Sequence, residues 1–345
     1  MLKENNFNTA LITGSSGFIG FHVAKILLDE GWLVTGLDSM SDYYDVKLKK
    51  DRLSILLKYE NYKFIKGKIE DKNFLRKTFQ DQKPQIVIHL AAQAGVRYSI
   101  EQPREYLESN IIGTYELLEA AREFPPKHIL IASTSSAYGA NEKMPYKETD
   151  KADLQMSFYA ATKKSTENIS HSYSHLFNLP ITAFRFFTVY GPWGRPDMAL
   201  FKFTKAIISG KKIDVYNHGD MRRDFTYIDD LINSIRLLID AVPESKNSNL
   251  KPKYTNDNLS PVAPFRLVNI GNSKPEKLID FIAAIEKKLD IKADMNLMPI
   301  QAGDVPATWA DTSLLSEITD YTPGTPIEAG VSNFIDWYNS YYEND

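Results

Sequence analysis

Short apolar runs alternate with longer amphipathic segments from residue 10 to about residue 186. The runs have the length of buried strands, and the segments between them have the apolar spacing of helices. Such alternation is typical of βαβ units, whose strands form a parallel sheet covered by helices on both faces. We therefore predict an α/β fold with a doubly wound parallel sheet. The expected strands lie at residues 10–13, 32–38, 62–65, 85–91, 128–132 and 180–186, and the expected helices include residues 17–30, 104–123 and 158–177.

Three glycines follow the first expected strand in the stretch ALITGSSGFIG, at Gly14, Gly17 and Gly20. Glycine lets the chain turn tightly, lets a pyrophosphate approach the backbone, and lets the helix pack close to the strand. The N-terminus of the helix that follows offers unpaired amides and a positive dipole end to phosphate oxygens. A glycine triplet alone could be only a turn. Its place between a strand and a helix predicts a Rossmann-type dinucleotide site.

Asp38 ends the second expected strand, where its carboxylate can accept hydrogen bonds from the adenosine ribose hydroxyls of a dinucleotide. The same carboxylate would repel a 2′-phosphate, and the neighbours Ser39 and Met40 offer no arginine to hold one. The sequence therefore favours NAD over NADP. The alternative is a carboxylate that only caps the end of a strand.

The pattern becomes irregular after residue 190, and helical spacing returns at residues 274–289 and 328–342. The polar segment 243–264 has no periodicity and is expected to be an exposed loop. We expect a Rossmann-type, NAD-binding domain over residues 1–187. A smaller, mixed α/β substrate domain is expected over residues 188–345, with some of its segments returning to the first domain.

Composition excludes several classes of function. The chain has 41 Lys and Arg against 44 Asp and Glu, so no strong overall charge attracts nucleic acid or an anionic membrane. It has no cysteine, which excludes disulfides and thiolate chemistry and suits a reducing compartment. The N-terminal stretch is polar, and no apolar run approaches the ~18 residues that span a bilayer. We expect a soluble cytoplasmic protein.

Tyr159 and Lys163 are four residues apart in a helical pattern, so they lie on one face about 6 Å apart along the helix axis. Free tyrosine has a pKa near ~10 and is a poor base at neutral pH. A nearby ammonium, together with a positive nicotinamide ring, would favour the phenolate. We predict that Tyr159 is a general base for an alcohol proton and that Lys163 also holds the nicotinamide ribose. The alternative is a surface pair without a catalytic role.

Six stretches spread over nearly the whole chain resemble the extended branch of the short-chain dehydrogenase/reductase superfamily, the NAD-dependent nucleotide-sugar epimerases and dehydratases. They are ALITGSSGFIG, HLAAQAGV, STSSAYG, YAATK, RFFTVYGP and RRDFTYIDD, and Asp38 fits the same family. The resemblance implies that Thr134 completes the catalytic set with Tyr159 and Lys163 by hydrogen-bonding the sugar O4. Beside the three glycines, Asp38 and Lys163, the NAD contacts that it implies are Phe18, Ile19, Ile69, Leu90, Ala91 and Ala92.

The two positions after Thr134 separate the reactions of this family. In the 4,6-dehydratases they are Asp and Glu, which move the protons that let water leave C6. In the decarboxylases that form UDP-xylose, a Glu stands in the same run. This chain has Ser135 and Ser136, neither of which is an acid or a base at neutral pH. The resemblance therefore implies oxidation at C4 followed by reduction, which is 4-epimerisation.

Thr188 and Arg195 follow the end of an expected strand. With Ser135 and Ser136, they are similar to the carboxylate-binding set of the UDP-glucuronate 4-epimerases, and a guanidinium suits a carboxylate because it can bind both oxygens. The resemblance implies interconversion of UDP-glucuronate and UDP-galacturonate. The alternatives are a 4-epimerase of UDP-glucose or a UDP-N-acetylhexosamine, and a loop arginine with no ligand.

The resemblance also assigns the remaining substrate contacts. It implies that Arg223 neutralises the diphosphate, that Asp304 contacts the uridine ribose, and that Arg97 is a further substrate-binding residue. Gln301 stands where the galactose epimerases have an arginine. Lys68 replaces an aspartate that bonds adenine in the family, so the adenine contact is expected to differ in this chain.

Three further expectations concern other functions and partners. A decarboxylase or dehydratase would need an acid after Thr134, and a non-catalytic NAD-binding regulator usually lacks the tyrosine or the lysine. His171 and His175 are four residues apart without a third ligand, so no metal site is expected. The resemblance implies a homodimer formed by the helices around residues 104–123 and 158–177.

Overall fold

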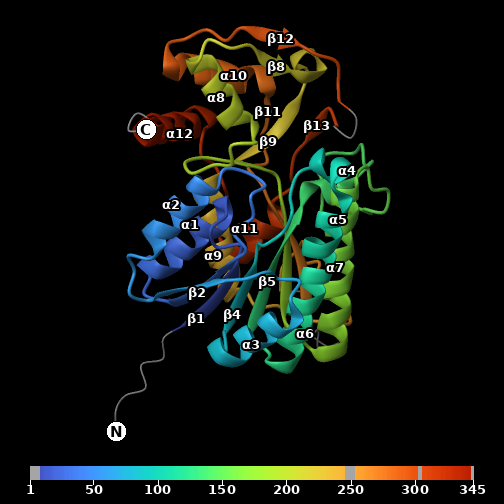
Figure 1. Ribbon diagram of the computed structural model, residues 1–345. Coiled ribbons are helices and arrows are strands. Elements are labelled where there is room, and N and C mark those ends of the chain that lie inside the picture. Colours follow the sequence, from blue (N-terminus) through green and yellow to red (C-terminus); the bar gives the residue numbers. More distant parts are fainter. Residues whose placement is uncertain (1–7, 245–252, 302–304, 343–345) are drawn as a thin grey trace.

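The computed structural model describes residues 8–244, 253–301 and 305–342. A large α/β part carries a smaller part at one end, with the loops that follow the central strands lying between them (Figure 1).

Seven parallel strands form the central sheet in the order β10-β6-β5-β4-β1-β2-β3. The chain runs outward from β1 to β3 in one direction and from β4 to β6 in the other. This reversal between β1 and β4 is where doubly wound sheets bind ligands. The prediction of a doubly wound parallel sheet is confirmed. The strands are β1 (Thr9–Thr13), β2 (Leu33–Asp38), β3 (Tyr62–Lys66), β4 (Ile86–His89), β5 (His128–Thr134), β6 (Ile181–Phe186) and β10 (Phe265–Ile270).

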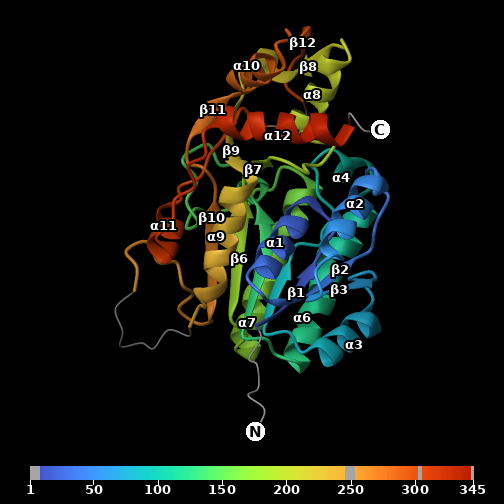
Figure 2. The ribbon, with the colours of Figure 1, turned by 90° about the vertical axis from the view of Figure 1, so that its left-hand side faces the viewer.

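Helices cover both faces of the sheet, as Figure 2 shows from the side. One layer contains α1 (Phe18–Asp29), α2 (Val46–Leu56), α9 (Ile228–Asp240) and α11 (Ser313–Thr319). The other contains α3 (Lys72–Gln82), α6 (Gly113–Glu123) and α7 (Phe158–Phe177). Because both faces are covered, the interior strands β4, β5 and β6 are buried at every residue rather than at alternate ones.

The helix expected at residues 104–123 is divided into three elements. These are α5 (Pro103–Tyr106), a π-helix (Leu107–Ile112) and α6, and they follow the single turn α4 (Tyr98–Glu101). A π-helix inserts an extra residue into the helical repeat and is frequent at functional sites. Here it turns the Asn110 side chain inward, where it is 1% exposed.

The smaller part is built from short strands and helices of the second half of the chain. Its strand β9 pairs with β7, β11 and β13, and β12 pairs with β8. Its elements are β7 (Thr188–Tyr190), α8 (Ala199–Ile208), β8 (Ile213–Val215), β9 (Arg222–Tyr227), β11 (Pro275–Lys277), α10 (Leu278–Leu289), β12 (Met295–Leu297), β13 (Ala307–Thr308) and α12 (Ile327–Tyr342). Two single-turn 3-10 helices, Ser135–Tyr138 and Tyr216–Gly219, complete the fold.

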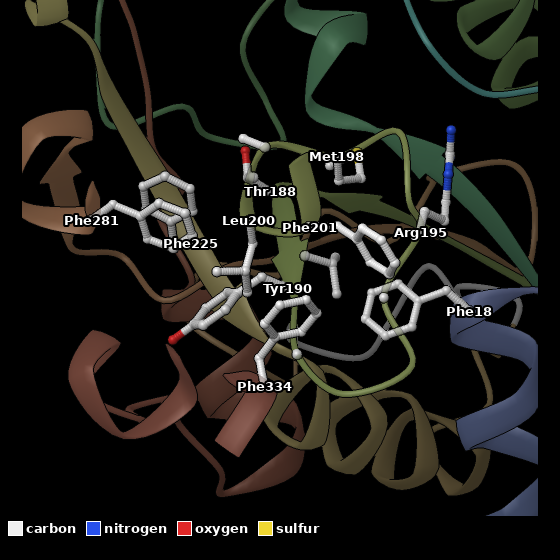
Figure 3. A pocket seen from close by; sticks show the side chains of 14 residues that line it. Phe18, Thr188, Tyr190, Arg195, Met198, Leu200, Phe201, Phe225, Phe281 and Phe334 are labelled. Carbon is white, nitrogen blue, oxygen red and sulfur yellow. The ribbon is translucent and has the colours of Figure 1, made fainter. Parts of the chain in front are cut away.

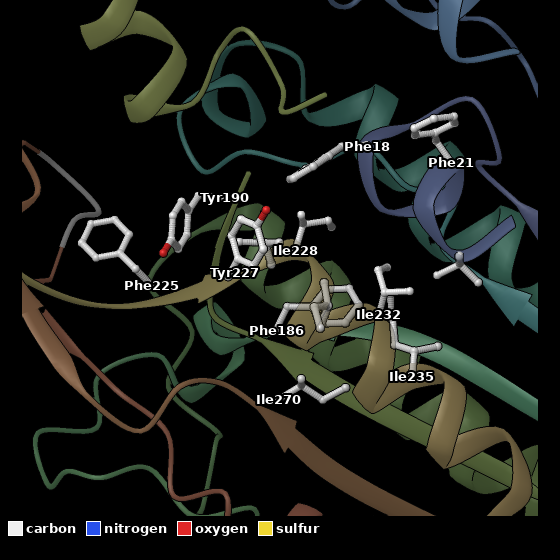
Figure 4. Packing of buried hydrophobic residues seen from close by; sticks show 14 of the residues in the cluster. Phe18, Phe21, Phe186, Tyr190, Phe225, Tyr227, Ile228, Ile232, Ile235 and Ile270 are labelled. Carbon is white, nitrogen blue, oxygen red and sulfur yellow. The ribbon is translucent and has the colours of Figure 1, made fainter. Parts of the chain in front are cut away.

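One continuous apolar core joins the large part to the smaller part. Figure 4 shows Phe18 and Phe21 of α1 on one side of it and Tyr190, Phe225 and Tyr227 on the other. Since these rings come from strands and helices far apart in the sequence, the loops between them are held on a shared apolar base.

No helix in the described part of the chain is long and apolar enough to cross a membrane.

Candidate active site

The candidate site lies at the carboxyl ends of the sheet strands. Gly14 follows β1, Asp38 ends β2, Leu90 follows β4, and Thr134 ends β5. Parallel strands end at one edge of a sheet, so these residues meet at the crevice where the strand order reverses.

The glycine loop has the close approaches that its sequence predicts. Gly14 adopts φ +74°, and a Cβ atom there would lie 2.9 Å from the amide nitrogen of Ala91. A Cβ atom on Gly20 would lie 2.1 Å from the carbonyl oxygen of Gly14. Gly17 is the N-cap of α1 and has no side-chain cap. No side chain caps the first backbone amides of α1. These amides can therefore donate hydrogen bonds to an external anion.

Asp38 is 7% exposed, and backbone amides fix both of its oxygens. Oδ2 accepts a hydrogen bond from the amide of Ser16 at 3.0 Å, and Oδ1 accepts one from Met40 at 2.8 Å. Each oxygen keeps a further lone pair for a ribose hydroxyl. Lys49, which sequence reasoning missed, lies near Asp38, and its ammonium donates to the carbonyl of Ser41 at 2.7 Å. Burial lowers the pKa of Lys49, and the Asp38 carboxylate opposes that shift.

The segment after β4 is tied to the end of β1. The hydroxyl oxygen of Thr13 accepts hydrogen bonds from the amides of Leu90 at 3.2 Å and Ala91 at 3.1 Å. This brings Leu90, Ala91 and the following Ala92 beside Gly14. Of the other residues expected to contact NAD, Phe18 and Ile69 are buried at 6% and 5% exposure, and Ile19 is partly buried against the core.

Lys68 points into solvent. Its side chain is 71% exposed and forms an ion pair with Glu70 at 3.4 Å. The structure therefore gives this lysine a partner on its own loop, and the expected change in adenine contact stays a prediction.

Thr134 and the two serines after it form the end of β5 and the 3-10 turn that follows. Thr134 is 8% exposed, and its hydroxyl oxygen accepts a hydrogen bond from the amide of Ser136 at 3.2 Å. Ser135 and Ser136 are partly exposed at the mouth of the crevice. The Thr134 hydroxyl also opposes the rise in the pKa of the Tyr159 phenol, at the place where β5 packs on α7.

Tyr159 and Lys163 lie one turn apart near the start of α7. Burial raises the pKa of Tyr159, while Thr134 and Arg195 partly oppose that shift. Burial lowers the pKa of Lys163 to about 8, against a smaller opposite effect of Glu167. The phenolate that Lys163 and a positive nicotinamide ring together are expected to favour stays a prediction.

Asn110 holds the catalytic helix against the loop after β4. Its amide nitrogen donates to the carbonyl of Gln93 and to the hydroxyl of Thr162, both at 3.0 Å, and its oxygen accepts from the amide of Gln93 at 2.8 Å. Sequence reasoning missed this residue, because a π-helix cannot be read from apolar spacing.

The residues at the β1, β2 and β4 ends fit a dinucleotide such as NAD. The Gly14–Gly20 approach leaves bare amides for a pyrophosphate, and Asp38 stands at the end of the neighbouring strand. The Lys163 side chain is 4% exposed, and its ammonium makes no hydrogen bond to any residue that the structure describes. A buried ammonium without a bond is suited to hydroxyl groups of a ligand.

Arg195 lies on the loop between β7 and α8. Its Nε donates to Oδ1 of Asp197 at 3.0 Å, and its Nη2 donates to Oδ2 at 2.5 Å. Burial alone would lower the pKa of Arg195, but the Asp197 carboxylate raises it above its ordinary value. Figure 3 shows the guanidinium pointing away from the aromatic rings around Phe201 and Phe334. Arg195 Nη2 donates to the carbonyl of Ala94 at 3.4 Å, and the next carbonyl, of Gly95, accepts from Tyr106, whose ring lies 5.9 Å from that of Tyr159. Arg195 therefore faces the same crevice as Tyr159.

An apolar cavity of about 20 Å³ lies beneath this loop, and Figure 3 shows side chains that line it. Thr188 and the aliphatic part of Arg195 contribute to its wall, together with aromatic rings of both parts. Because of its small volume, it is a packing defect beside the crevice rather than a ligand site.

Arg52 fixes the loop that carries Arg195. It is 0% exposed, and its two terminal nitrogens donate to the carbonyls of Ser16 at 3.0 Å, Trp193 at 2.6 Å and Gly194 at 3.4 Å. No carboxylate among the described residues forms an ion pair with it. One buried side chain thus links the glycine loop directly to the Arg195 loop.

The remaining substrate residues lie toward the smaller part. Arg223 on β9 donates to the carbonyl of Pro306 at 3.2 Å. The Arg97 guanidinium stacks over the ring of Tyr216 at 4.9 Å, beside an open pocket of about 340 Å³ that Gln301 also lines. Asp304 lies outside the described residues.

No group of three or more histidine or acidic side chains that could hold a metal occurs among the residues the structure describes. His171 bonds the hydroxyl of Ser260 at 2.9 Å, and His175 bonds the carbonyl of Val262 at 2.7 Å. Both histidines therefore anchor the loop before β10 to α7.

The sequence model of the NAD dependent epimerase/dehydratase family matches residues 10–250, which is more than half of the chain. The chain belongs to this family. The match includes the glycine loop, Asp38, the Thr134 turn and the Tyr159–Lys163 pair. The family is NAD-dependent and its members are enzymes, in agreement with the fit of the crevice to a dinucleotide.

Relatives within the epimerase family are similar over nearly the full length. A probable UDP-glucuronate 4-epimerase of Rhizobium meliloti (strain 1021) is 51% identical over 332 residues, 96% of this chain and 97% of the relative. Protein CapI of Staphylococcus aureus is 52% identical over 335 residues, 96% of this chain and 99% of the relative.

Solved structures agree with this similarity. The UDP-glucuronic acid 4-epimerase of Bacillus cereus, in complex with UDP-glucuronic acid and NAD, superimposes with a TM-score of 0.85 at 32% identity over 97% of this chain and 100% of that one. The UDP-glucose 4-epimerase of Thermotoga maritima with UDP-glucose has a TM-score of 0.82 at 26% identity, covering 96% and 99%.

Proposed function

We propose that the protein is a UDP-glucuronate 4-epimerase, which interconverts UDP-glucuronate and UDP-galacturonate through a 4-keto intermediate. The observation that carries the proposal is the pairing of two features in one crevice. The Arg195 guanidinium bonds the loop after β4 beside the tyrosine that packs on Tyr159, and the two residues directly after Thr134 are serines rather than acids. The relatives named UDP-glucuronate 4-epimerase support this reading.

Proton transfer at O4 is assigned to Tyr159. The Thr134 hydroxyl, which acts on the pKa of the phenol, is assigned the sugar O4 as its second hydrogen-bond partner, so that it orients this oxygen. Tyr159 takes the O4 proton when C4 is oxidised and returns it when C4 is reduced, so the residue is regenerated in each cycle.

NAD, when bound, accepts the hydride of C4 and gives it back. The residues of this chain position the cofactor and the substrate. The glycine loop and the start of α1 hold the pyrophosphate, Asp38 and Lys163 hold the two riboses, and Arg223 holds the diphosphate of the substrate. Reduction of the opposite face requires the sugar to turn, and the anchored diphosphate retains it during that turn.

The sugar carboxylate is assigned to Arg195, Thr188, Ser135 and Ser136. A guanidinium and three hydroxyls can satisfy both carboxylate oxygens with charge-assisted hydrogen bonds. Since Ser135 and Ser136 cannot transfer protons at neutral pH, elimination of water from C6 has no acid or base at these positions.

Epimerisation of UDP-glucose is the second candidate. It is favoured by the ion pair between Arg195 and Asp197, which leaves the sugar end of the crevice without net charge. A neutral hexose could occupy such a site without an uncompensated cation.

We assign residues 1–187 to the NAD-binding domain and residues 188–345 mainly to the UDP-sugar-binding domain. In this assignment α9, β10 and α11 are the segments that return to the first domain, because they pack on or join its sheet. The cytoplasmic location expected from the sequence stays a prediction.

We also propose a homodimer through α6 and α7. Exposed apolar side chains on these helices and the adjoining π-helix support it, since Ile112, Tyr115 and Phe177 are 39%, 42% and 38% exposed. Light scattering coupled to size-exclusion chromatography tests this, and a mass near the 39.3 kDa of one chain would contradict it.

Incubation with UDP-glucuronate, UDP-glucose and UDP-N-acetylglucosamine in separate reactions tests the proposed function. Proton NMR identifies the products, with no reductant added. UDP-galacturonate formed from the first substrate alone is the expected result. Epimerisation of UDP-glucose alone would support a 4-epimerase but contradict UDP-glucuronate as its substrate. A 4-keto-6-deoxy product would contradict the assignment as a 4-epimerase.

A further inference from the structure

The guanidinium that the proposed function assigns to the substrate is already bound to a carboxylate of its own loop. Asp197 takes Nε and Nη2 of Arg195 at 3.0 and 2.5 Å. Nη2 also donates to the carbonyl of Ala94 at 3.4 Å. These contacts engage one full edge of the guanidinium.

This edge is the one that binds carboxylates best. Two parallel N–H groups match the two oxygens of a carboxylate, and a bidentate pair is stronger than two separate bonds. A second carboxylate on the same guanidinium would lie close to the first, and like charges repel each other more strongly in a partly buried site than in water. The Arg195 and Asp197 side chains are only 21% and 26% exposed. A sugar carboxylate that binds the Nε and Nη2 edge with both of its oxygens therefore has to exchange with Asp197.

The backbone around the pair is held in place. Arg52 binds the carbonyls of Trp193 and Gly194 just before Arg195. The amide of Met198 donates to the carbonyl of Arg195 at 3.2 Å, which closes a turn around Asp197. Exchange therefore needs only rotation of the Asp197 side chain.

Asp197 has a second hydrogen-bond donor besides Arg195. The Tyr43 phenol donates to Oδ2 of Asp197 at 3.3 Å. The same ring lies under the Arg195 guanidinium at 5.7 Å. A released Asp197 carboxylate has the Tyr43 phenol within reach as a donor, and its side chain is 26% exposed, so water can bond the other oxygen.

We propose that Asp197 is an exchangeable counter-ion of Arg195, which is released when the carboxylate of an acidic sugar takes the same edge of the guanidinium. Asp197 thereby sets how strongly the site prefers acidic over neutral sugars. Substrate and product of the proposed reaction carry the same carboxylate, so the internal competitor weakens the binding of both and favours product release. The inference rests on the proposed function, because it takes a sugar carboxylate as the ligand of Arg195.

The test measures binding of UDP-glucuronate and UDP-glucose by titration calorimetry. The NAD-loaded protein carries Tyr159→Phe in every sample, so that neither sugar is converted. Asp197→Asn keeps the shape of the side chain and removes its charge. Asp29→Asn is the matched control, because Asp29 pairs with Lys25 in the last turn of α1, at the other end of that helix from the site.

Asp197→Asn is expected to lower the Kd of UDP-glucuronate about tenfold, the size of one charge-assisted contact, and to change that of UDP-glucose less than about twofold. Asp29→Asn is expected to change neither. Asp197→Ala, which has no side-chain oxygen at all, must shift the same Kd in the same direction. This variant carries the test if the asparagine variant does not fold.

Two results would overturn the inference alone. If Asp197→Asn weakens UDP-glucuronate binding while wild-type protein still epimerises that sugar, Asp197 positions Arg195 and does not compete for it. If both sugars shift alike, the effect is a general change of the site. If wild-type protein neither binds nor converts UDP-glucuronate, the proposed function fails, and the inference fails with it.

Discussion

The phenol of Tyr159 and the ammonium of Lys163 stand one turn apart on α7, and burial shifts the pKa of each toward its uncharged form. The pKa of the phenol rises, and that of the ammonium falls to about 8. Burial therefore opposes the phenolate and the ammonium alike. Thr134 and Arg195 are the groups that pull the pKa of Tyr159 back down.

Tyr159→Phe removes the group that exchanges the O4 proton and keeps the ring that packs at 5.9 Å against Tyr106. We expect kcat to fall by about 10²- to 10⁴-fold, with the Kd of the UDP-sugar changed by less than about threefold. Tyr59→Phe is the control and should keep full activity, because that phenol bonds only the exposed Asp29 at the end of α1 away from the site. A Tyr159→Phe enzyme with more than a tenth of wild-type kcat would remove Tyr159 from the mechanism.

The pH dependence of kcat/KM tests the role of Lys163. Its ammonium is present below a pKa of about 8 and is lost as the pH rises through that value, so kcat/KM should fall on the alkaline side. Lys163→Arg keeps the charge at all these pH values and should move the alkaline limit upward by at least about one pH unit. An unchanged alkaline limit in Lys163→Arg would assign that limit to another group.

Gly20→Ala places a methyl group 2.1 Å from the carbonyl oxygen of Gly14, where only backbone could move aside. The glycine loop should distort, and we expect a loss of stability of about 1–3 kcal/mol together with weaker NAD binding. Bound NAD after purification and the unfolding midpoint measure both. Gly324→Ala is the control, because a Cβ there meets nothing closer than 3.9 Å. Equal NAD content in the two variants would contradict the role of the loop.

Arg195→Ala removes the proposed carboxylate partner. We expect the KM of UDP-glucuronate to rise about 10- to 100-fold. A second effect should follow from chemistry, since a 4-keto-glucuronate is a β-keto acid and loses CO2 once its carboxylate aligns with the carbonyl. The variant should therefore release more 4-ketopentose per epimer formed, as measured by NMR. Arg104→Ala, which breaks an exposed pair with Glu108 on another helix, should show neither effect.

Glu148 gives a prediction for stability. Burial raises its pKa to about 7, although its Oε1 accepts a hydrogen bond from the amide of Asn269 at 2.7 Å. A raised carboxyl pKa means that the folded state holds a proton that the unfolded state has lost, so the stability from this group is full below about pH 4.5 and is lost as the pH rises through 7.

Glu148→Gln should abolish this loss and stabilise the protein by about 1–3 kcal/mol at pH 8, with little effect at pH 4.5. Urea unfolding at the two pH values measures the difference. A destabilised Glu148→Gln at pH 8 would mean that the charged carboxylate is favoured in the fold.

Local sequence predicted the parts of the site that lie within one strand, turn or helix. Gly14 and Gly20 lie where the chain turns from β1 into α1, and Thr134 ends a strand that is visible as an apolar run. Tyr159 and Lys163 share one helical face. The parts that were missed depend on contacts between distant segments. Arg52 meets Trp193 across 141 positions of the chain, and β10 joins the sheet beside β6 although a polar segment precedes it.

Asp197 shows a different limit. It lies only two residues from Arg195 in the sequence, but an acidic residue near an arginine is common in loops and does not by itself indicate a site. Only the bidentate geometry in the crevice identifies it as the occupant of the predicted carboxylate site.

The central claim is that C4 of the sugar loses and regains its own hydride within one active site. UDP-glucuronate with deuterium at C4, converted in ordinary water and analysed by NMR and mass spectrometry, tests it most directly. The account predicts UDP-galacturonate that keeps the full deuterium content at C4. Loss of the label to solvent would contradict it, because the C4 hydrogen would then have left as a proton.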